Sequence, residues 1–322
     1  MKPAFKVLNM ADAPFLQEEF KLLHGFAEVT HMAADQQRLA ACISEYDAYF
    51  CSLHTQIDLR VLEAATRLRV IVTPSTGLDH IDMDYAGAKG IEVLSLRGDT
   101  EFLKGITATA ELAWGLLLAV VRRIPWSFEA VQQGDWARDR FRGRQLRGKT
   151  LGVLGYGRLG SIVAEYGKAF GMNVIACEQQ DVDLAGIRKV TFHTLLQESD
   201  VLSIHIHLSP ENKQLLNREA FSRMRDGVVL INTSRGAIID EQALLGALTS
   251  GKVAGAGLDV IEGEWREDLH KHPLIEYARE HANLLISPHI GGVTWESQLL
   301  AYRHSIHKLY AYLLKRSEEE LL

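Results

Sequence analysis

Residues 149–178 read KTLGVLGYGRLGSIVAEYGKAFGMNVIACE, and this stretch decides the fold. The run at 150–154 is rich in residues that favour strands, and it leads into glycines with the spacing G-x-G-x-x-G. These glycines open a helical pattern that ends near Phe170, and a second strand candidate at 173–177 is followed by Glu178. A strand, a glycine turn, a helix and a second strand with a terminal acid form the complete context of a dinucleotide-binding unit.

Each glycine of the turn has its own physical role. Gly155 permits the tight turn, Gly157 lets the backbone approach a pyrophosphate, and Gly160 lets the helix pack closely on the strand. The helix begins at Arg158 and Leu159, where unpaired N–H groups and the positive end of the helix dipole face the phosphates. We therefore expect all five residues to bind the cofactor.

The acidic residue after the second strand indicates which dinucleotide is bound. Glu178 lies 18 residues after Gly160, where a carboxylate accepts hydrogen bonds from the adenosine ribose and repels a 2′-phosphate. The next two residues are both glutamine, and no arginine is present there to bind such a phosphate. The sequence therefore predicts NAD rather than NADP as the cofactor.

Outside this unit, short strand-like runs alternate with helix-length amphipathic segments along almost the whole chain. The first series of strand candidates lies at 5–9, 26–30, 48–52, 69–73 and 91–95, with helical patterns at 15–23, 36–43, 59–65 and 83–89. A second series lies at 150–154, 173–177, 201–205, 228–232, 254–258 and 284–287. Such alternation is typical of parallel sheets with helices on both faces. Because the second series is too long to extend the first sheet, we expect an α/β protein with two doubly wound sheets.

Two longer helical patterns bear on the domain organisation. One, at 106–123, lies between the two series of strands, and the other, at 295–316, follows the last strand. Since no strand comes after the second helix, we expect it to cross back onto the first sheet. The first domain would then be discontinuous, with hinges near residues 103 and 290.

Composition excludes several classes of protein. The chain has 322 residues, with 35 Lys and Arg against 41 Asp and Glu, and this negative balance argues against a protein that follows nucleic-acid phosphates. The longest apolar run, at 112–121, is too short for a bilayer, and no signal peptide is visible. Three cysteines without a C-x-x-C spacing favour neither disulfides nor a metal site. We expect a cytoplasmic protein without a metal, in which the 112–121 helix is core or the interface of a homodimer.

Polar residues follow three later strands of the second series. Arg235 lies in NTSRGAIID, Asp259 and Glu264 lie in GLDVIEGEW, and His289 lies in SPHIGG. The carboxyl ends of parallel strands meet at one edge of a sheet, which is where doubly wound folds bind ligands. Together with the glycine turn, PSTGLDHID and VLSIHIHLSPENKQLLN, these segments resemble the D-isomer-specific 2-hydroxyacid dehydrogenase family over nearly the whole chain.

The resemblance implies a fold and a role for each of these positions. A flavodoxin-like substrate domain would comprise residues 1–103 and 291–322, and a Rossmann NAD domain would comprise 104–290. Arg235 would bind substrate, His289 would be the acid/base, and Glu264 would be its partner. Asp259 would lie near the nicotinamide carboxamide. The further residues implied are Thr233 and His207 at the cofactor, and Ser75, Thr76 and Gly77, whose backbone N–H groups would bind the substrate carboxylate.

These residue types suit the reduction of a 2-oxo acid, which needs a hydride and a proton. A histidine can deliver the proton near neutral pH, and a carboxylate on its other ring nitrogen fixes the tautomer. The planar guanidinium of Arg235 matches a carboxylate, and its fixed charge polarises the adjacent carbonyl. The sequence thus predicts hydride transfer between NAD(H) and a small 2-oxo or D-2-hydroxy acid.

The chain departs from the family pattern at two places. The family usually has proline after the glutamate, whereas Trp265 stands here, followed by the longer segment REDLHKHP. The stretch LRGDTEFLKGITATAE is also longer than usual and carries Arg97 and Lys104. Either cation would meet an acidic substrate, or both are surface charges at a hinge.

A second class of function remains open at this point. Corepressors that resemble this family keep the fold and the cofactor site, and they can retain the arginine, glutamate and histidine. The alternative to an enzyme is therefore an NAD(H)-sensing interaction protein, or a scaffold without activity. Assays of NADH oxidation with a panel of 2-oxo acids separate these alternatives.

Overall fold

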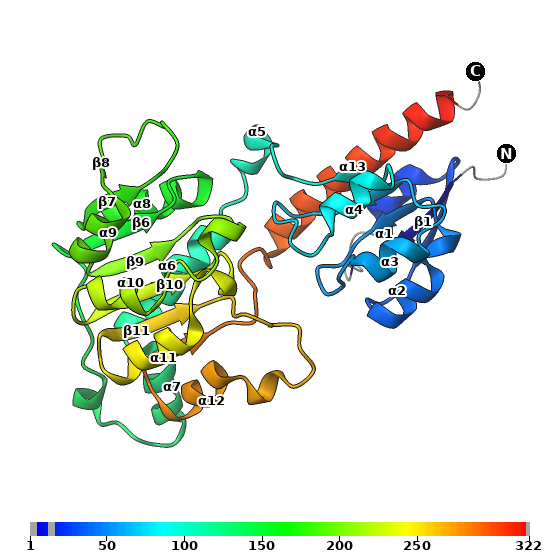
Figure 1. Cartoon of the computed structure of the whole chain (residues 1–322). Coiled ribbons are helices and arrows are strands. Elements are labelled where there is room, and N and C mark those ends of the chain that lie inside the picture. Colours follow the sequence, from blue (N-terminus) through cyan, green and yellow to red (C-terminus); the bar gives the residue numbers. More distant parts are fainter. Residues whose placement is uncertain (1–4, 12–16, 320–322) are drawn as a thin grey trace. The chain divides into compact units, whose positions relative to one another are not determined.

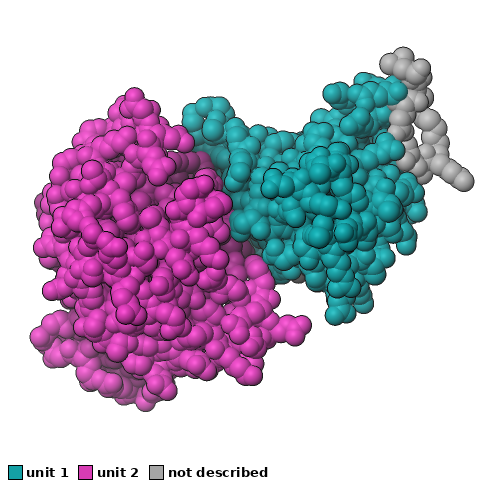
Figure 2. All heavy atoms as spheres, viewed as in Figure 1, with its two compact units in different colours: residues 1–106, 295–322 teal, residues 107–294 magenta. Residues whose placement is uncertain are grey.

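The structure is a computed structural model that describes residues 5–11 and 17–319. The chain forms two compact units, one of residues 1–106 and 295–322 and the other of residues 107–294 (Figures 1 and 2). The chain therefore passes between the units at 106/107 and 294/295, a few residues beyond the expected hinges near 103 and 290.

The first unit contains a parallel sheet of five strands in the order β2-β1-β3-β4-β5. This is the strand order of flavodoxin-like folds, and it confirms the predicted class. The strands, from the first to the last along the chain, are β1 (Phe5–Asn9), β2 (Ala27–His31), β3 (Ala48–Phe50), β4 (Val70–Val72) and β5 (Glu92–Leu94).

Aspartate side chains begin three helices of this unit. Asp35, Asp58 and Asp82 each accept a hydrogen bond from a backbone N–H in the first turn, which satisfies a group that the helix leaves free. The expected helix at 15–23 begins outside the described residues, and from residue 17 onward it is a helix and a 3₁₀ turn. The helical elements are α1 (Gln17–Phe20), η2 (Lys21–Leu23), α2 (Gln36–Cys42), η3 (Ile43–Glu45), α3 (Leu59–Ala64), α4 (Met83–Ala88), α5 (Thr100–Leu103) and α13 (Trp295–Glu319).

Alternate residues of these strands face opposite sides of the sheet, as the two-residue repeat of a strand requires. On one face, Val7 and Phe50 pack in a cluster with Ile306, Leu309 and Leu313 of α13. On the other face, a separate cluster includes side chains from α2, α3 and the intervening strands. The last helix therefore packs on the first sheet although it follows the second sheet in the sequence.

The second unit contains a parallel sheet of seven strands in the order β12-β11-β10-β9-β6-β7-β8. Two half-sheets meet at β6 and β9, which is the arrangement of a dinucleotide-binding fold. One strand, β8, consists of two charged residues, and its lack of apolar alternation explains why the sequence did not indicate it. The strands are β6 (Thr150–Leu154), β7 (Asn173–Cys177), β8 (Arg188–Lys189), β9 (Val201–Ile204), β10 (Val228–Asn232), β11 (Val253–Leu258) and β12 (Leu284–Ile286).

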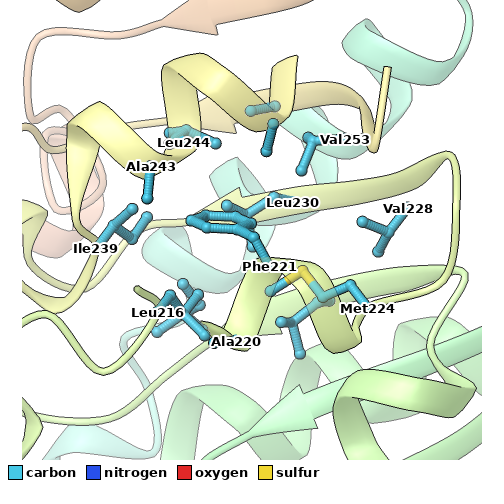
Figure 3. Packing of buried hydrophobic residues seen from close by; sticks show 14 of the residues in the cluster. Leu216, Ala220, Phe221, Met224, Val228, Leu230, Ile239, Ala243, Leu244 and Val253 are labelled. Carbon is cyan, nitrogen blue, oxygen red and sulfur yellow. The ribbon is translucent and has the colours of Figure 1, made fainter. Parts of the chain in front are cut away.

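Helices cover both faces of this sheet. On one face, Phe221 packs with Leu216, Leu230, Ile239 and Leu244, as Figure 3 shows. On the opposite face lie α6 and α8. The helical elements of the unit are α6 (Ala108–Val121), α7 (Ile124–Gln132), η4 (Arg138–Phe141), α8 (Arg158–Ala169), α9 (Phe192–Glu198), η5 (Pro210–Asn212), α10 (Arg218–Arg223), η6 (Gly236–Ile238), α11 (Glu241–Thr249), η7 (Leu269–Lys271) and α12 (Pro273–Glu280).

The apolar helix α6 belongs to the core of its own unit. By length and composition alone, the segment Thr100–Val121 could cross a membrane. However, Ala113, Leu117 and Val120 are buried in the cluster that joins α6 to the second sheet. Of the two readings of residues 112–121, core and dimer interface, the structure supports the core, because little apolar surface of α6 is left for another copy.

Candidate active site

The glycine turn lies after β6, where the two halves of the second sheet meet. Gly155 has a φ of 91°, and a Cβ on it would lie 2.7 Å from the carbonyl oxygen of His205. A Cβ on Gly160 would lie 2.0 Å from the carbonyl oxygen of Gly155, whereas a Cβ on Gly157 would meet nothing within 4 Å. Packing thus requires the first and third glycines, and the second leaves open space in which a phosphate group fits.

The carboxylate of Glu178 lies beside this turn. One of its oxygens accepts a 2.8 Å hydrogen bond from the backbone N–H of Tyr156, and the other accepts a 2.9 Å bond from Gln180. The end of β7 is therefore fixed against the phosphate-binding turn. This position suits a carboxylate that accepts hydrogen bonds from the adenosine ribose.

The next loop of the site follows β10. Asn232 is fully buried, donates a 2.9 Å hydrogen bond to the carbonyl of Arg235 and accepts one from the backbone N–H of Ser234. These bonds fold residues 232–235 into a tight turn. Inside it, the hydroxyl of Thr233 is buried and has no hydrogen-bond partner among the described residues. A buried hydroxyl without a partner is costly, so a bound group that bonds to Thr233 would stabilise the loop.

Two histidines and an arginine border the cofactor region. Nε2 of His205 lies 2.7 Å from the hydroxyl of Ser203, and its buried Nδ1 has no partner among the described residues. Burial therefore lowers the pKa of His205 to about 4. His207 is exposed, and its carbonyl accepts a hydrogen bond from Asn212. Arg158 is the first residue of α8, and burial lowers the pKa of its guanidinium.

Asp259, immediately after β11, organises the turn after β12. Its buried carboxylate accepts hydrogen bonds from the hydroxyl of Ser287 at 2.6 Å and from the backbone N–H groups of Ile290 at 2.9 Å and Gly291 at 2.7 Å. Burial raises the pKa of Asp259, while these three donors favour the charged form. The carboxylate thus holds the turn that carries His289, in addition to any contact with a cofactor.

His289 and Glu264 form a short contact within this region. Nδ1 of His289 lies 2.6 Å from Oε1 of Glu264, and both side chains are partly buried. The backbone of His289 has a φ of 53°, a conformation that is strained for a residue with a side chain. The carboxylate makes Nδ1 the protonated nitrogen of the neutral ring, so Nε2 is left for proton transfer to or from a substrate.

The indole of Trp265 stacks on the His289 ring. The ring centroids lie 6.2 Å apart with an angle of 26° between the planes. The residue that replaces the usual proline therefore covers one side of the imidazole in the same chain. After it, Arg266 pairs with Asp268, and η7 leads into α12.

Arg235 begins η6 on the loop beside the one that carries Glu264. Its side chain is half-buried, and Nη1 donates a 2.7 Å hydrogen bond to the carbonyl of Ser234. A Cβ on the next residue, Gly236, would lie 2.1 Å from the carbonyl carbon of Ile261 and 2.3 Å from the nitrogen of Glu262. The backbones of the two loops are thus in direct contact, two residues before Glu264.

A second acid–imidazole pair supports these loops, and sequence reasoning missed it. Oε1 of Glu241 accepts a 2.7 Å hydrogen bond from the backbone of Glu262, and its other oxygen lies 3.2 Å from Nε2 of His272. His272 is buried and also begins α12, since its Nδ1 accepts a bond from Leu274. Burial is the main cause that raises the pKa of Glu241. A histidine directly before the proline that opens a helix was the available signal.

In the other unit, the loop after β4 has its own hydrogen-bond network. The hydroxyl of Ser75 donates to the carbonyl of Gly77 at 2.7 Å and lies 2.9 Å from the hydroxyl of Thr73. That hydroxyl lies 3.2 Å from Nε2 of the buried His80. The segment 75–77, expected to bind a substrate carboxylate, is therefore held from within the unit.

Comparison with known proteins gives a consistent result. Residues 114–291 match the family model described as D-isomer specific 2-hydroxyacid dehydrogenase, NAD binding domain. The hydroxypyruvate reductase of Thermotoga maritima is 36% identical over 288 residues, which cover 89% of this chain and 91% of that protein. The D-3-phosphoglycerate dehydrogenase of Archaeoglobus fulgidus is 37% identical over 268 residues, covering 82% of this chain and 49% of that protein, so this chain spans about half its length.

A solved structure shares the architecture of the whole chain. The D-lactate dehydrogenase from Aquifex aeolicus, in complex with NAD and lactic acid, superposes with a TM-score of 0.83 and 30% sequence identity. The match covers 97% of this chain and 96% of that chain. The likeness therefore includes both sheets and the long final helix.

Proposed function

The chain belongs to the D-isomer specific 2-hydroxyacid dehydrogenase family and is an NAD-dependent oxidoreductase, and we propose that it interconverts a small 2-oxo acid and its D-2-hydroxy acid with His289, Glu264 and Arg235 as the catalytic residues. The observation that carries this proposal is the 2.6 Å contact between His289 and Glu264 beside the loop of Arg235. Bound NADH supplies the hydride, and the chain must supply the proton and the orientation.

His289 acts as the proton donor in reduction. Nε2 carries the proton to the substrate oxygen as that oxygen gains negative charge, and Glu264 stabilises the ring through Nδ1. In the oxidation direction, Nε2 removes the hydroxyl proton. Trp265 covers one side of the ring, which limits the access of water to the imidazole.

Arg235 binds and polarises the substrate. Its guanidinium matches a carboxylate with two hydrogen bonds, and its fixed charge stabilises the developing alkoxide. The turn built by Asn232 and the contact of Gly236 with Ile261 hold its backbone in place. Ser75, Thr76 and Gly77 bind the substrate carboxylate through backbone N–H groups; this assignment remains a prediction.

The cofactor is NAD rather than its 2′-phosphorylated form. Gly155, Gly157 and Gly160, with Arg158 and Leu159, hold the pyrophosphate at the start of α8. Further contacts come from the carboxylate of Glu178 at the ribose, the unpartnered hydroxyl of Thr233, His207, and Asp259 at the nicotinamide carboxamide. Equal turnover with NADPH and NADH would contradict this preference.

The experiment that tests the function is a steady-state assay of NADH oxidation with glyoxylate, pyruvate, hydroxypyruvate and 3-phosphohydroxypyruvate. We expect turnover of at least one acid, and its loss in His289→Ala with NADH binding unchanged. If the wild-type chain binds NADH and turns over none of the acids, the chain is a nucleotide-sensing interaction protein or scaffold instead.

The assembly is a homodimer that operates in the cytoplasm without a membrane or nucleic acid. The apolar surface for the dimer comes from α7 and the residue after it rather than from α6: Phe128 is 63% exposed and Trp136 is 82% exposed, with Ile124 and Val131 nearby in the sequence. Exposed apolar groups of this size favour burial against a second copy. Light scattering should give a dimer for the wild type and a monomer for Phe128→Glu.

A further inference from the structure

Two loops of the first unit lie together at the carboxyl edge of its sheet. β4 and β5 are neighbours, with Val72 opposite Leu94, so the segments that follow them leave the sheet at the same edge. The backbone N–H of Leu96 donates a 3.0 Å hydrogen bond to the carbonyl of Ser75. The loop expected to bind the substrate carboxylate is therefore paired directly with the segment that contains Arg97.

The guanidinium of Arg97 lies against this loop. Its Nε donates a 3.4 Å hydrogen bond to the carbonyl of Thr76, and the side chain is exposed. At this length the bond is weak, so most of the donor capacity of the guanidinium remains for another acceptor. An arginine offers a rigid fork that matches the two oxygens of a carboxylate or phosphate.

The charges around Arg97 do not neutralise it. Asp99 accepts hydrogen bonds from Lys308 at 2.8 Å and lies 3.0 Å from Nε2 of His304. Glu101 pairs with Lys104 at 2.7 Å. Both acids of the segment are thus occupied by other cations, and no carboxylate among residues 5–11 and 17–319 forms an ion pair with Arg97.

The position of Arg97 is fixed from both sides. Leu96 is buried, and Lys308 of α13 donates a 2.6 Å hydrogen bond to the carbonyl of Ser95 as well as binding Asp99. Gly98 then turns the chain with a φ of 91°. A charged side chain on such an anchored turn loses little conformational freedom when it binds a ligand.

We propose that Arg97 binds a second anionic group of the substrate, so that the preferred substrate is a 2-oxo acid that also carries a phosphate or a second carboxylate. This inference rests on the proposed function, because it assumes that residues 75–77 bind the first carboxylate. Lys104, the other cation of the segment, is neutralised by Glu101 and does not take part.

The test compares kcat/KM for hydroxypyruvate, 3-phosphohydroxypyruvate and oxaloacetate in the wild type and in Arg97→Met. We expect the variant to lose roughly 10- to 100-fold in kcat/KM for the two acids with a second anion, mainly through KM, as for lost hydrogen bonds to a charged group. Hydroxypyruvate should change less than about twofold, since it lacks the second charge. The larger loss identifies whether phosphate or carboxylate is the preferred group.

The matched control is Lys104→Met, which removes the same charge from the same segment and should leave all three substrates unchanged. Arg97→Lys should recover part of the loss, because it restores charge without the planar fork. An equal loss for all three acids in Arg97→Met, or the same loss in Lys104→Met, would overturn this inference alone. Failure of the wild type to reduce any acid would instead overturn the proposed function on which it rests.

Discussion

Glu264 and His289 meet with 2.6 Å between Oε1 and Nδ1, although they lie on loops after two different strands. The contact depends on two supports. Asp259 holds the turn of His289, and Glu241 with His272 holds the backbone of Glu262, two residues before Glu264. The geometry of the acid–imidazole pair is therefore a property of the whole carboxyl edge of the second sheet.

Removal of the charge on Glu264 tests the role of this contact. Glu264→Gln keeps the size and a hydrogen-bond acceptor but no longer stabilises a protonated ring, so we expect kcat to fall about 10- to 100-fold. His289→Ala should fall further, by roughly 100- to 10,000-fold, because the proton donor itself is lost. NADH binding, measured by fluorescence titration, should stay unchanged in both. A kcat equal to that of the wild type in Glu264→Gln would contradict the assignment.

Two glycines of the phosphate-binding turn should respond differently to the same change. A methyl group on Gly160 would collide with the backbone of Gly155, so Gly160→Ala should lower the melting temperature of the protein. A methyl group on Gly157 meets only open space, so Gly157→Ala should keep its melting temperature and lose affinity for NADH. Thermal unfolding and NADH titration together separate these effects. Loss of stability in Gly157→Ala would count against the open phosphate site.

The buried pair of Glu241 and His272 should stabilise the fold more than a simple helix cap. His272→Ala removes the start of α12 and leaves a carboxylate that is only 15% exposed without its partner, at a cost of about 3 kcal/mol. Thr191→Ala removes only the cap of α9 and should cost about 1 kcal/mol. Urea unfolding measures both values, and kcat should fall only in His272→Ala. Equal costs would mean that the pair adds nothing beyond capping.

His205 predicts a pH dependence of stability. Its pKa is about 4 in the folded protein and near 6.5 when unfolded, so the unfolded chain binds more protons between these values. The free energy of unfolding should therefore fall as the pH drops through this window, by on the order of 2 kcal/mol between pH 7 and pH 5. His205→Gln, which cannot titrate, should show a smaller decrease in urea unfolding at the two pH values. The same decrease in both proteins would assign the effect to other groups.

Local patterns explain which parts of the fold were predictable. The glycine turn, the strands that flank it and the two separate parallel sheets follow from spacing and alternation within short windows. β8 was missed because two charged residues have no alternation to detect. Residues 112–121 offered two readings, because apolar composition does not distinguish a helix packed against its own sheet from one packed against a second copy.

The sequence by itself determined the fold class, the family and the position of each candidate site residue along the chain, because these depend on residue type and on short-range spacing. Only the tertiary structure decided which distant residues touch: Glu241 and His272 lie 31 positions apart, and Arg97 meets Thr76 across two loops. Such contacts arise from the packing of strands and helices against one another. No local pattern encodes them, since the chain segments between the partners contribute length but no direction.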